Sequence, residues 1–362
     1  MNALLRTDIT TTGFLAALAA VSVLVVVGLR LLRLPRPGVL AVVLVLLVVN
    51  TGALANGYYD YYRDLGFVLG DAPADQVALD ELLTRTGVPG HGEIAPFPIP
   101  AAASGFDARP ALVWVPPAWF ARPRPQLPVV VLLHGTPGSP QDWIDGGRAA
   151  DTANAFAAAH GGRAPILVMP DINGSVTADS ECVDGPAGRA ETYLTDDLVA
   201  AVHRTFRTLG PGPAWAVAGL SEGGSCAVTL ALRHPAVFGT FGDYAGLAGP
   251  RSGDTNAVGS TVGDLFDGDR AAFAGHEPAA LLATRRFPGL GGWFETGSAD
   301  PQPLAAAHRL APAARAAGID VCTRTVDGGG HDFDLFSAAF ADSLPWLAGR
   351  TGPFPPVGCP AG

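Results

Sequence analysis

Hydrophobic residues crowd the N-terminal end of this chain in two long stretches that contain no charged side chain. The first runs over residues 9–29 and the second over residues 37–59. An α-helix needs about 20 apolar residues to cross a hydrocarbon layer of roughly 30 Å. The pattern therefore predicts a transmembrane helical hairpin in residues 1–59, with helices at about 9–29 and 38–59.

The residues that flank these stretches indicate how the two helices would lie in a membrane. The short connection between them carries Arg30, Arg33 and Arg36, and the second stretch ends in tyrosines at 58, 59, 61 and 62. Arginine-rich loops stay in the cytoplasm, and tyrosines gather at the membrane surface. We therefore expect a two-pass protein of the cell membrane whose remaining chain is extracytoplasmic. The alternative is a signal peptide, which would begin with a more basic segment than residues 1–8,.

Beyond residue 59 the pattern changes to short apolar runs that alternate with helical patterns. Residues 60–90 predict a linker with one short helix at 74–84, residues 91–349 a catalytic domain, and residues 350–362 a Pro/Gly-rich tail. The apolar runs predict strands at 111–115, 129–133, 166–169, 215–218, 238–244, 292–295 and 321–326. Helices are predicted at 148–160, 191–207, 222–233, 301–317 and 332–347, whereas the insertion at 243–277 shows no clear pattern. This alternation predicts an α/β fold with a mostly parallel sheet and helices on both faces.

Polar residues follow several of the predicted strands, at the edge of the sheet where α/β proteins bind ligands. The strand at 129–133 leads into His134-Gly-Thr, and the strand at 166–169 leads into Pro170-Asp-Ile-Asn. The last two strands lead to Asp300 and, after three glycines, to His331. We expect the functional site at this edge of the sheet.

The segment Gly219-Leu-Ser221-Glu-Gly223 stands between an apolar run of strand character and a helix-forming run. A serine on such a strand–turn–helix turn is typical of the nucleophile in α/β hydrolases. The bare motif is weak evidence, because the composition of this chain gives about 0.2 such matches by chance. The strand before it and the helix after it make Ser221 the candidate nucleophile.

A serine nucleophile needs a base within hydrogen-bond reach and an acid that orients this base. In α/β hydrolases the order along the chain is nucleophile, acid, histidine, and Ser221, Asp300 and His331 follow it,. We expect these three residues to form a catalytic triad. Taken singly, Asp300 also fits a helix N-cap and His331 a solvated loop histidine. Three other acids are rivals of Asp300: Asp327, Glu295 and Asp332.

The oxyanion that develops during attack on an ester needs two backbone N–H donors. One is normally supplied by the residue after the nucleophile, which is Glu222,. The second is expected from the turn after the strand at 129–133, where we choose Thr136, with Gly135 as the fallback. His134 is expected to hold this turn in a structural role.

The composition excludes some functions and leaves others open. The net charge of −10 and the absence of lysine argue against a nucleic-acid partner,. No cysteine or histidine spacing indicates a metal, and no cofactor is expected. The four cysteines allow up to two disulfides in three pairings, among them a bridge from Cys322 to Cys359 in the tail,. Buried free thiols at 182, 226 and 322 are the alternative.

Several motifs together resemble the putative-esterase branch of the α/β-hydrolase superfamily, which holds enterochelin esterases, S-formylglutathione hydrolases and mycolyltransferases. The motifs are Pro170-Asp-Ile-Asn-Gly-Ser, Ala190-Glu-Thr-Tyr-Leu-Thr, Gly219-Leu-Ser-Glu-Gly-Gly-Ser, Leu232-Arg-His-Pro and Gly328-Gly-Gly-His. The resemblance covers about residues 91–348. It implies an α/β-hydrolase fold and the triad and oxyanion donors named above.

The chain departs from the mycolyltransferases at one turn, where they have Asp-Gly-Leu-Arg and this chain has His134-Gly-Thr-Pro137. Asp171 and Glu191 are expected to offer polar contacts near an acyl acceptor, although Glu191 fits equally well as a charge at a helix start. The sequence thus predicts a membrane-anchored serine esterase or acyltransferase that acts on a small-molecule or lipid ester through an acyl-serine intermediate. The alternatives are mycolyltransferase-like acyl transfer to a cell-envelope acceptor and a catalytically silent binding module at the cell surface.

Overall fold

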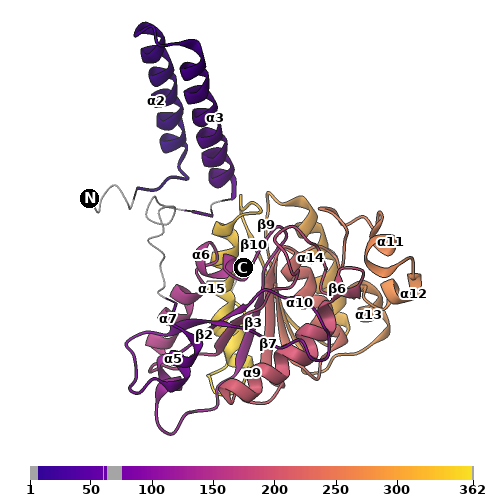
Figure 1. Ribbon diagram of the computed structural model, residues 1–362. Coiled ribbons are helices and arrows are strands. Elements are labelled where there is room, and N and C mark those ends of the chain that lie inside the picture. Colours follow the sequence, from indigo (N-terminus) through magenta and orange to yellow (C-terminus); the bar gives the residue numbers. More distant parts are fainter. Residues whose placement is uncertain (1–6, 60, 63–75, 361–362) are drawn as a thin grey trace. The chain divides into compact units, whose positions relative to one another are not determined.

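The computed structural model describes residues 7–59, 61–62 and 76–360 of the chain. Residues 60 and 63–75 of the expected linker, including the start of its helix at Ala74, lie outside these ranges. The chain forms two compact units, one containing the N-terminal helices and the other containing a large sheet (Figure 1).

The first unit contains two long apolar helices, α2 (Thr12–Leu31) and α3 (Arg36–Tyr59). At the start of α2 the Thr11 hydroxyl accepts a hydrogen bond from the Phe14 N–H at 3.2 Å and caps the helix,. The Asn50 amide of α3 donates to the Ser22 hydroxyl of α2 at 2.9 Å and joins the two helices. Both helices have a mean hydropathy of 2.5 and are long and apolar enough to cross a membrane.

The second unit is built on an eight-stranded sheet. Its strands are β1 (Glu93–Phe97), β2 (Ala111–Val115), β3 (Val129–Leu133), β4 (Ile166–Met169), β7 (Gly212–Leu220), β8 (Phe238–Tyr244), β9 (Gly291–Gly297) and β10 (Asp320–Val326). They lie in the order β1-β2-β4-β3-β7-β8-β9-β10. β1, β2 and β4 pair antiparallel, and all later neighbours pair parallel. Two short strands, β5 (Asp184–Gly185) and β6 (Gly188–Arg189), form a separate hairpin.

Helices lie on both faces of this sheet (Figure 1). The larger ones are α7 (Ala149–Ala159), α9 (Leu198–Phe206), α10 (Glu222–Arg233), α14 (Pro301–Ala316) and α15 (Phe333–Arg350). Shorter ones are α5 (Leu79–Thr84), η1 (Pro117–Phe120), α6 (Asp142–Asp145), α8 (Ala190–Thr192), the π-helical turn η2 (Tyr193–Asp197), α11 (Thr261–Phe266), α12 (Arg270–Ala274) and α13 (Pro278–Thr284). The predicted α/β architecture is confirmed.

Strand β3 illustrates how the sequence produces these layers. All five of its side chains are buried. Val129, Val131 and Leu133 belong to a core that also contains residues of α9, α10 and α14. Val130 and Leu132 point to the other face, because successive side chains alternate along a strand. A strand buried on both faces appears in the sequence as an unbroken apolar run, which is how β3 was predicted.

Three parts of this unit differ from the sequence-based expectation. Strand β1 was not predicted, since it contains Pro96, which is tolerated here because β1 is an edge strand,. Residues 76–84 pack on this strand: the Val77 N–H donates to the Ile94 carbonyl at 2.8 Å, and Leu82 of α5 is fully buried. The compact unit therefore begins before His91. The insertion at 243–277 folds into α11, α12 and the lead-in to α13.

All four cysteines are paired in disulfides. Cys182 bonds to Cys226 with their Cα atoms 5.6 Å apart, and Cys322 bonds to Cys359 with a Cα separation of 5.5 Å. The second bridge fastens the tail to β10, as one of the two expectations had it. The alternative of free thiols at 182, 226 and 322 is wrong.

Candidate active site

Ser221 occupies a sharp turn between β7 and α10. Its backbone has φ 55° and ψ −122°, a conformation that costs a non-glycine residue about 1–3 kcal/mol,. The turn is possible because glycines flank it: a Cβ on Gly219 would overlap the backbone of Gly223, and a Cβ on Gly223 would overlap the carbonyls of Leu133 and His134,. The Ser221 N–H donates to the Tyr244 carbonyl at 2.9 Å and fixes the turn on the sheet.

The structure brings Ser221, His331 and Asp300 together in a chain of hydrogen bonds. The Ser221 hydroxyl donates to His331 Nε2 at 2.8 Å, and His331 Nδ1 donates to Asp300 Oδ2 at 2.6 Å. These directions require the His331 tautomer with its proton on Nδ1. Asp300 is nearly buried, with 12% of its side chain exposed, and His331 is half-buried at 35%. This geometry is that of a nucleophile, a base and an orienting acid.

Two neighbouring loops hold the acid and the base. Asp300 follows β9 and precedes Pro301, the first residue of α14,. The Ser298 N–H donates to the Val326 carbonyl at 2.9 Å, and the Ala299 N–H donates to the Gly329 carbonyl at 3.0 Å. These bonds tie the Asp300 loop to the loop that ends in His331. The position of the pair therefore follows from the parallel pairing of β9 with β10.

The rival acids have other partners. Asp327 is exposed and accepts a hydrogen bond from the Ser298 hydroxyl at 3.2 Å. Glu295 lies in β9, fully buried, where it accepts from Trp293 Nε1 at 2.9 Å. Burial raises the pKa of Glu295 to about 7. The carboxylate bonded to His331 Nδ1 is that of Asp300, and not that of the adjacent Asp332.

The turn expected to supply the second oxyanion donor lies directly against Ser221. A Cβ on Gly135 would stand 3.1 Å from Ser221 Cβ, so the Gly135–Thr136 backbone borders the nucleophile. Glu222 is the first residue of α10, and its N–H has no partner within the helix,. The N–H groups of Thr136 and Glu222 thus come from the two segments that meet at Ser221.

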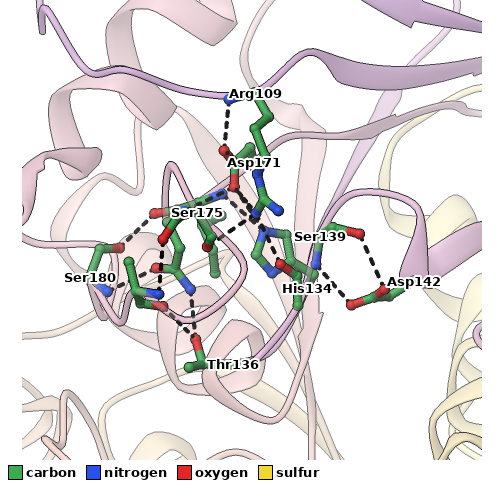
Figure 2. A network of polar contacts seen from close by, with 12 residues as sticks. Arg109, His134, Thr136, Ser139, Asp142, Asp171, Ser175 and Ser180 are labelled. Carbon is green, nitrogen blue, oxygen red and sulfur yellow. Dashed lines mark hydrogen bonds and ion pairs between the residues drawn. The ribbon is translucent and has the colours of Figure 1, made fainter.

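His134 belongs to a network of polar contacts beside this turn (Figure 2). His134 Nδ1 donates to the Gly135 carbonyl at 2.7 Å, and its Nε2 accepts from the Ile172 N–H at 3.2 Å. Arg109 binds the buried Asp171 beside it, with Nη2 2.7 Å from Oδ1. Burial alone would raise the pKa of Asp171, but the adjacent His134 ring and the hydrogen bonds from Arg109 outweigh this effect and hold the pKa below its usual range. His134 is therefore structural, and Asp171 is occupied inside the protein instead of facing an acceptor.

Glu191, the other expected acceptor contact, is also occupied internally. It is buried and binds Arg233 Nε at 2.5 Å, His234 Nε2 at 2.6 Å and His276 Nε2 at 2.9 Å. Burial would raise the pKa of Glu191, but these three partners together lower it below its ordinary value. The cluster fastens the insertion, through His276, to α8 and α10. Its role is to hold the fold.

Sequence reasoning missed the side chains around the Glu222 carboxyl. Glu222 was singled out for its backbone N–H, yet its carboxyl contacts the Thr136 hydroxyl and the Asn173 amide. Asn173 belongs to the motif Pro170-Asp-Ile-Asn-Gly-Ser, which follows β4, so the sequence already indicated that it lies at the edge of the sheet where the site forms. Arg109 lies in a loop before β2, and no pattern in the sequence marks it. Among the described residues no group of histidine, cysteine or acidic side chains is arranged to hold a metal.

A mostly parallel sheet with a serine at a strand–turn–helix turn defines the α/β-hydrolase class. Within this class, the model of the family described as "Putative esterase" matches residues 107–347. The chain belongs to this family of esterases. The expectation drawn from its motifs is thereby confirmed.

Several individual proteins are similar to this chain. An uncharacterized protein of Corynebacterium glutamicum is 34% identical over 328 residues, covering 86% of this chain and 76% of the relative. Among solved structures, an S-formylglutathione hydrolase from Agrobacterium tumefaciens has 22% identity and a TM-score of 0.61, covering 74% of this chain and 99% of its own. FphF, a fluorophosphonate-binding serine hydrolase of Staphylococcus aureus, has 15% identity and a TM-score of 0.56, covering 71% and 99%. At these identities the two solved structures demonstrate a shared fold.

Proposed function

We propose that this protein is a serine esterase or acyltransferase that acts on carboxylic esters through an acyl-serine intermediate. The observation that carries the proposal is the hydrogen-bonded chain from the Ser221 hydroxyl to His331 Nε2, at 2.8 Å, and from His331 Nδ1 to Asp300 Oδ2, at 2.6 Å. A serine hydroxyl is a poor nucleophile by itself and becomes reactive when such a base removes its proton.

The first half of the proposed reaction uses every part of this arrangement. Ser221 Oγ attacks the ester carbonyl as its proton passes to His331 Nε2. The carboxylate of Asp300 stabilises the imidazolium that forms, and the N–H groups of Thr136 and Glu222 donate to the carbonyl oxygen as it becomes an oxyanion. His331 then returns the proton to the leaving alcohol, and the acyl group remains on Ser221.

In the second half His331 removes a proton from an incoming hydroxyl, which attacks the acyl-serine. Water gives hydrolysis, and an alcohol gives acyl transfer to a new ester. Both fates use the same residues in reverse order. The proposal therefore covers an esterase and, as its variant, acyl transfer to a cell-envelope acceptor.

Removal of the Ser221 hydroxyl tests this function directly. We expect the wild type to hydrolyse p-nitrophenyl esters and to react with a fluorophosphonate probe, and we expect Ser221→Ala to lose both. Ser225→Ala, one helical turn away, is the matched control, since the Ser225 hydroxyl accepts from the Leu247 N–H and does not contact His331. Ester turnover by Ser221→Ala at the wild-type rate would refute the proposal. A wild type that is inert to esters and to the probe but binds lipid or glycan would favour the silent binding module.

We further propose that α2 and α3 anchor the enzyme in the cell membrane with its catalytic unit on the extracytoplasmic side. The two disulfides support this location, because disulfides persist in oxidising compartments and are rare in the cytosol,. The arginine-rich connection between the helices supports a cytoplasmic loop. In intact spheroplasts, added protease should reach the catalytic unit but not a tag inserted between α2 and α3. Protection of the catalytic unit would overturn this orientation.

A further inference from the structure

Three acidic side chains gather beside the nucleophile turn. Glu222 and Glu181 are buried, with 7% and 4% of their surface exposed, and Asp179 lies close to both. Within the described part of the chain, Glu181 Oε2 and Asp179 Oδ1 are buried without a hydrogen-bond donor. A buried carboxylate oxygen without a donor is costly, whereas a shared proton would satisfy it.

The Glu222 carboxyl joins the nucleophile turn to two loops. Its Oε2 forms a short hydrogen bond with the Thr136 hydroxyl and accepts from Asn173 Nδ2 at 2.8 Å. Its Oε1 accepts from the Glu181 N–H at 3.1 Å. Thr136 is the residue whose backbone N–H is the second oxyanion donor in the proposed mechanism. Glu222 therefore links the two donor segments through its own side chain.

The hydrogen-bond donors and acceptors around the Thr136 hydroxyl favour a neutral Glu222 carboxyl. Asn173 Nδ2 already donates to the Thr136 hydroxyl at 2.6 Å, and this hydroxyl has one proton and two acceptors in reach. The acceptors are the Ala178 carbonyl, at 3.2 Å, and Glu222 Oε2. If Glu222 is protonated, its O–H donates to Thr136 and the Thr136 hydroxyl donates to Ala178. If Glu222 is ionised, Thr136 must donate to Glu222 and the bond to Ala178 is lost.

The charges around Glu222 also favour its neutral form. Burial, and then the nearby Asp179, raise the pKa of Glu222, against the lowering effect of its hydrogen bonds from Thr136 and Asn173. Burial likewise raises the pKa of Asp179 and of Glu181. The charged or titratable groups around the cluster are His134, Asp179, Glu181, Arg251 and Asp254, with His331 on the far side of Ser221.

Arg251 is the arginine among these neighbours, and it is paired with a carboxylate outside the cluster. Arg251 Nη1 lies 2.5 Å from Glu277 Oε1 in a buried ion pair. Arg251 lowers the pKa of Glu181, but this effect is smaller than the increase caused by burial and by the neighbouring Glu222 and Asp179. The cluster therefore has more carboxyl groups than cations to neutralise them, and retained protons relieve the repulsion.

We propose that Glu222, as a neutral carboxyl, is a positioning residue that fastens the Gly135–Thr136 turn to the nucleophile turn and so keeps the two oxyanion donors aligned. The inference rests on the proposed esterase function. Ionisation of Glu222 reverses its hydrogen bond with Thr136, so that the bond from Thr136 to Ala178 is lost, and it places a negative charge one residue from the site where the oxyanion forms. Both effects raise the energy of the transition state more than that of bound substrate.

The expected signature is a loss of kcat at alkaline pH with little change in KM. Three variants of the full chain in detergent micelles test it, each assayed on a p-nitrophenyl ester between about pH 5 and about pH 9. Glu222→Gln stays neutral, and it should keep at least about one-third of the wild-type kcat and lose the alkaline decline. Glu222→Ala removes the link and should lower kcat by about 10²-fold at the pH where the wild type is most active, with KM changed by less than about threefold. Glu295→Gln, a buried carboxyl that does not contact Thr136 or Ser221, should keep the wild-type profile.

Two results would overturn the inference. One is an alkaline decline of Glu222→Gln that matches the wild type, and the other is a Glu222→Ala variant as active as Glu222→Gln. Fluorophosphonate labelling of the wild type distinguishes these two results from failure of the esterase proposal. If the wild type is labelled at Ser221, the esterase proposal stands and only the role of Glu222 is refuted. If the wild type is not labelled, both proposals are refuted. Circular dichroism at each pH confirms that the variants remain folded, so that a loss of kcat is read on folded protein.

Discussion

Asp300→Ala is the variant that most sharply separates the proposed acid from its rivals. In the wild type the Asp300 carboxylate lies 2.6 Å from His331 Nδ1. At an effective dielectric constant of about 20, a full charge pair at this separation contributes about 6 kcal/mol once His331 becomes cationic. The partial exposure of His331 to solvent reduces this figure,. A remaining loss of about 5 kcal/mol corresponds to about 10⁴-fold in kcat.

The assay is steady-state hydrolysis of a p-nitrophenyl ester by the full chain in detergent, with active sites counted by fluorophosphonate titration of the wild type. Asp327→Ala is the matched control, because Asp327 lies on the neighbouring loop and binds the Ser298 hydroxyl instead of His331. It should keep kcat within about threefold of the wild type. A loss of kcat below about tenfold in Asp300→Ala, or a loss in Asp327→Ala as large as in Asp300→Ala, would rule out Asp300 as the orienting acid.

Two further predictions concern stability. Opening either disulfide removes a cross-link over 44 or 37 residues, so the pairs Cys182→Ser/Cys226→Ser and Cys322→Ser/Cys359→Ser should each lower the unfolding free energy by about 4 kcal/mol,. Denaturant unfolding measures this, and a loss below about 1 kcal/mol in either would contradict it. Burial raises the pKa of Asp243 from 3.8 to about 7, so the folded state binds this proton more tightly than the unfolded state does,. The contribution of this proton to the free energy of unfolding should be full below about pH 4 and should be lost as pH rises through 7, a decrease of roughly 4 kcal/mol,. Asp243→Asn should flatten this part of the pH dependence, and an unchanged slope in that variant would count against it.

The sequence predicted the central strands, because strands buried on both faces are written as unbroken apolar runs such as residues 129–133,. It predicted helix α10 with the same bounds, since Ser221 and the glycines around it mark the helix start. It did not predict β1, where Pro96 breaks the pattern but lies in an edge strand of the sheet, in which proline is tolerated,. Likewise, residues 76–84 appeared to be a linker because their packing on β1 depends on partners distant in sequence.

Part of the proposed site could also be predicted from the sequence, and part could not. The order of Ser221, Asp300 and His331 could be read from the sequence because each follows a strand, and parallel strands bring their ends together. The contacts of the Glu222 carboxyl were not predicted, because Thr136 lies in the loop after β3, Asn173 and Glu181 lie in the loop after β4, and the meeting of these two loops at Glu222 depends on the fold. For the same reason Asp171 and Glu191 were expected to face an acceptor, although in the structure both are buried and each is paired with an arginine.

The central claim is that Ser221 is the nucleophile of an acyl-serine enzyme, and one measurement tests it most directly. The purified full chain is incubated with a fluorophosphonate or an activated ester, digested, and analysed by mass spectrometry to locate the covalent adduct. We expect a single adduct on Ser221 that disappears in His331→Ala, because the serine then lacks its base. An unmodified Ser221, or an adduct on another residue of a chain that still turns over esters, would contradict it.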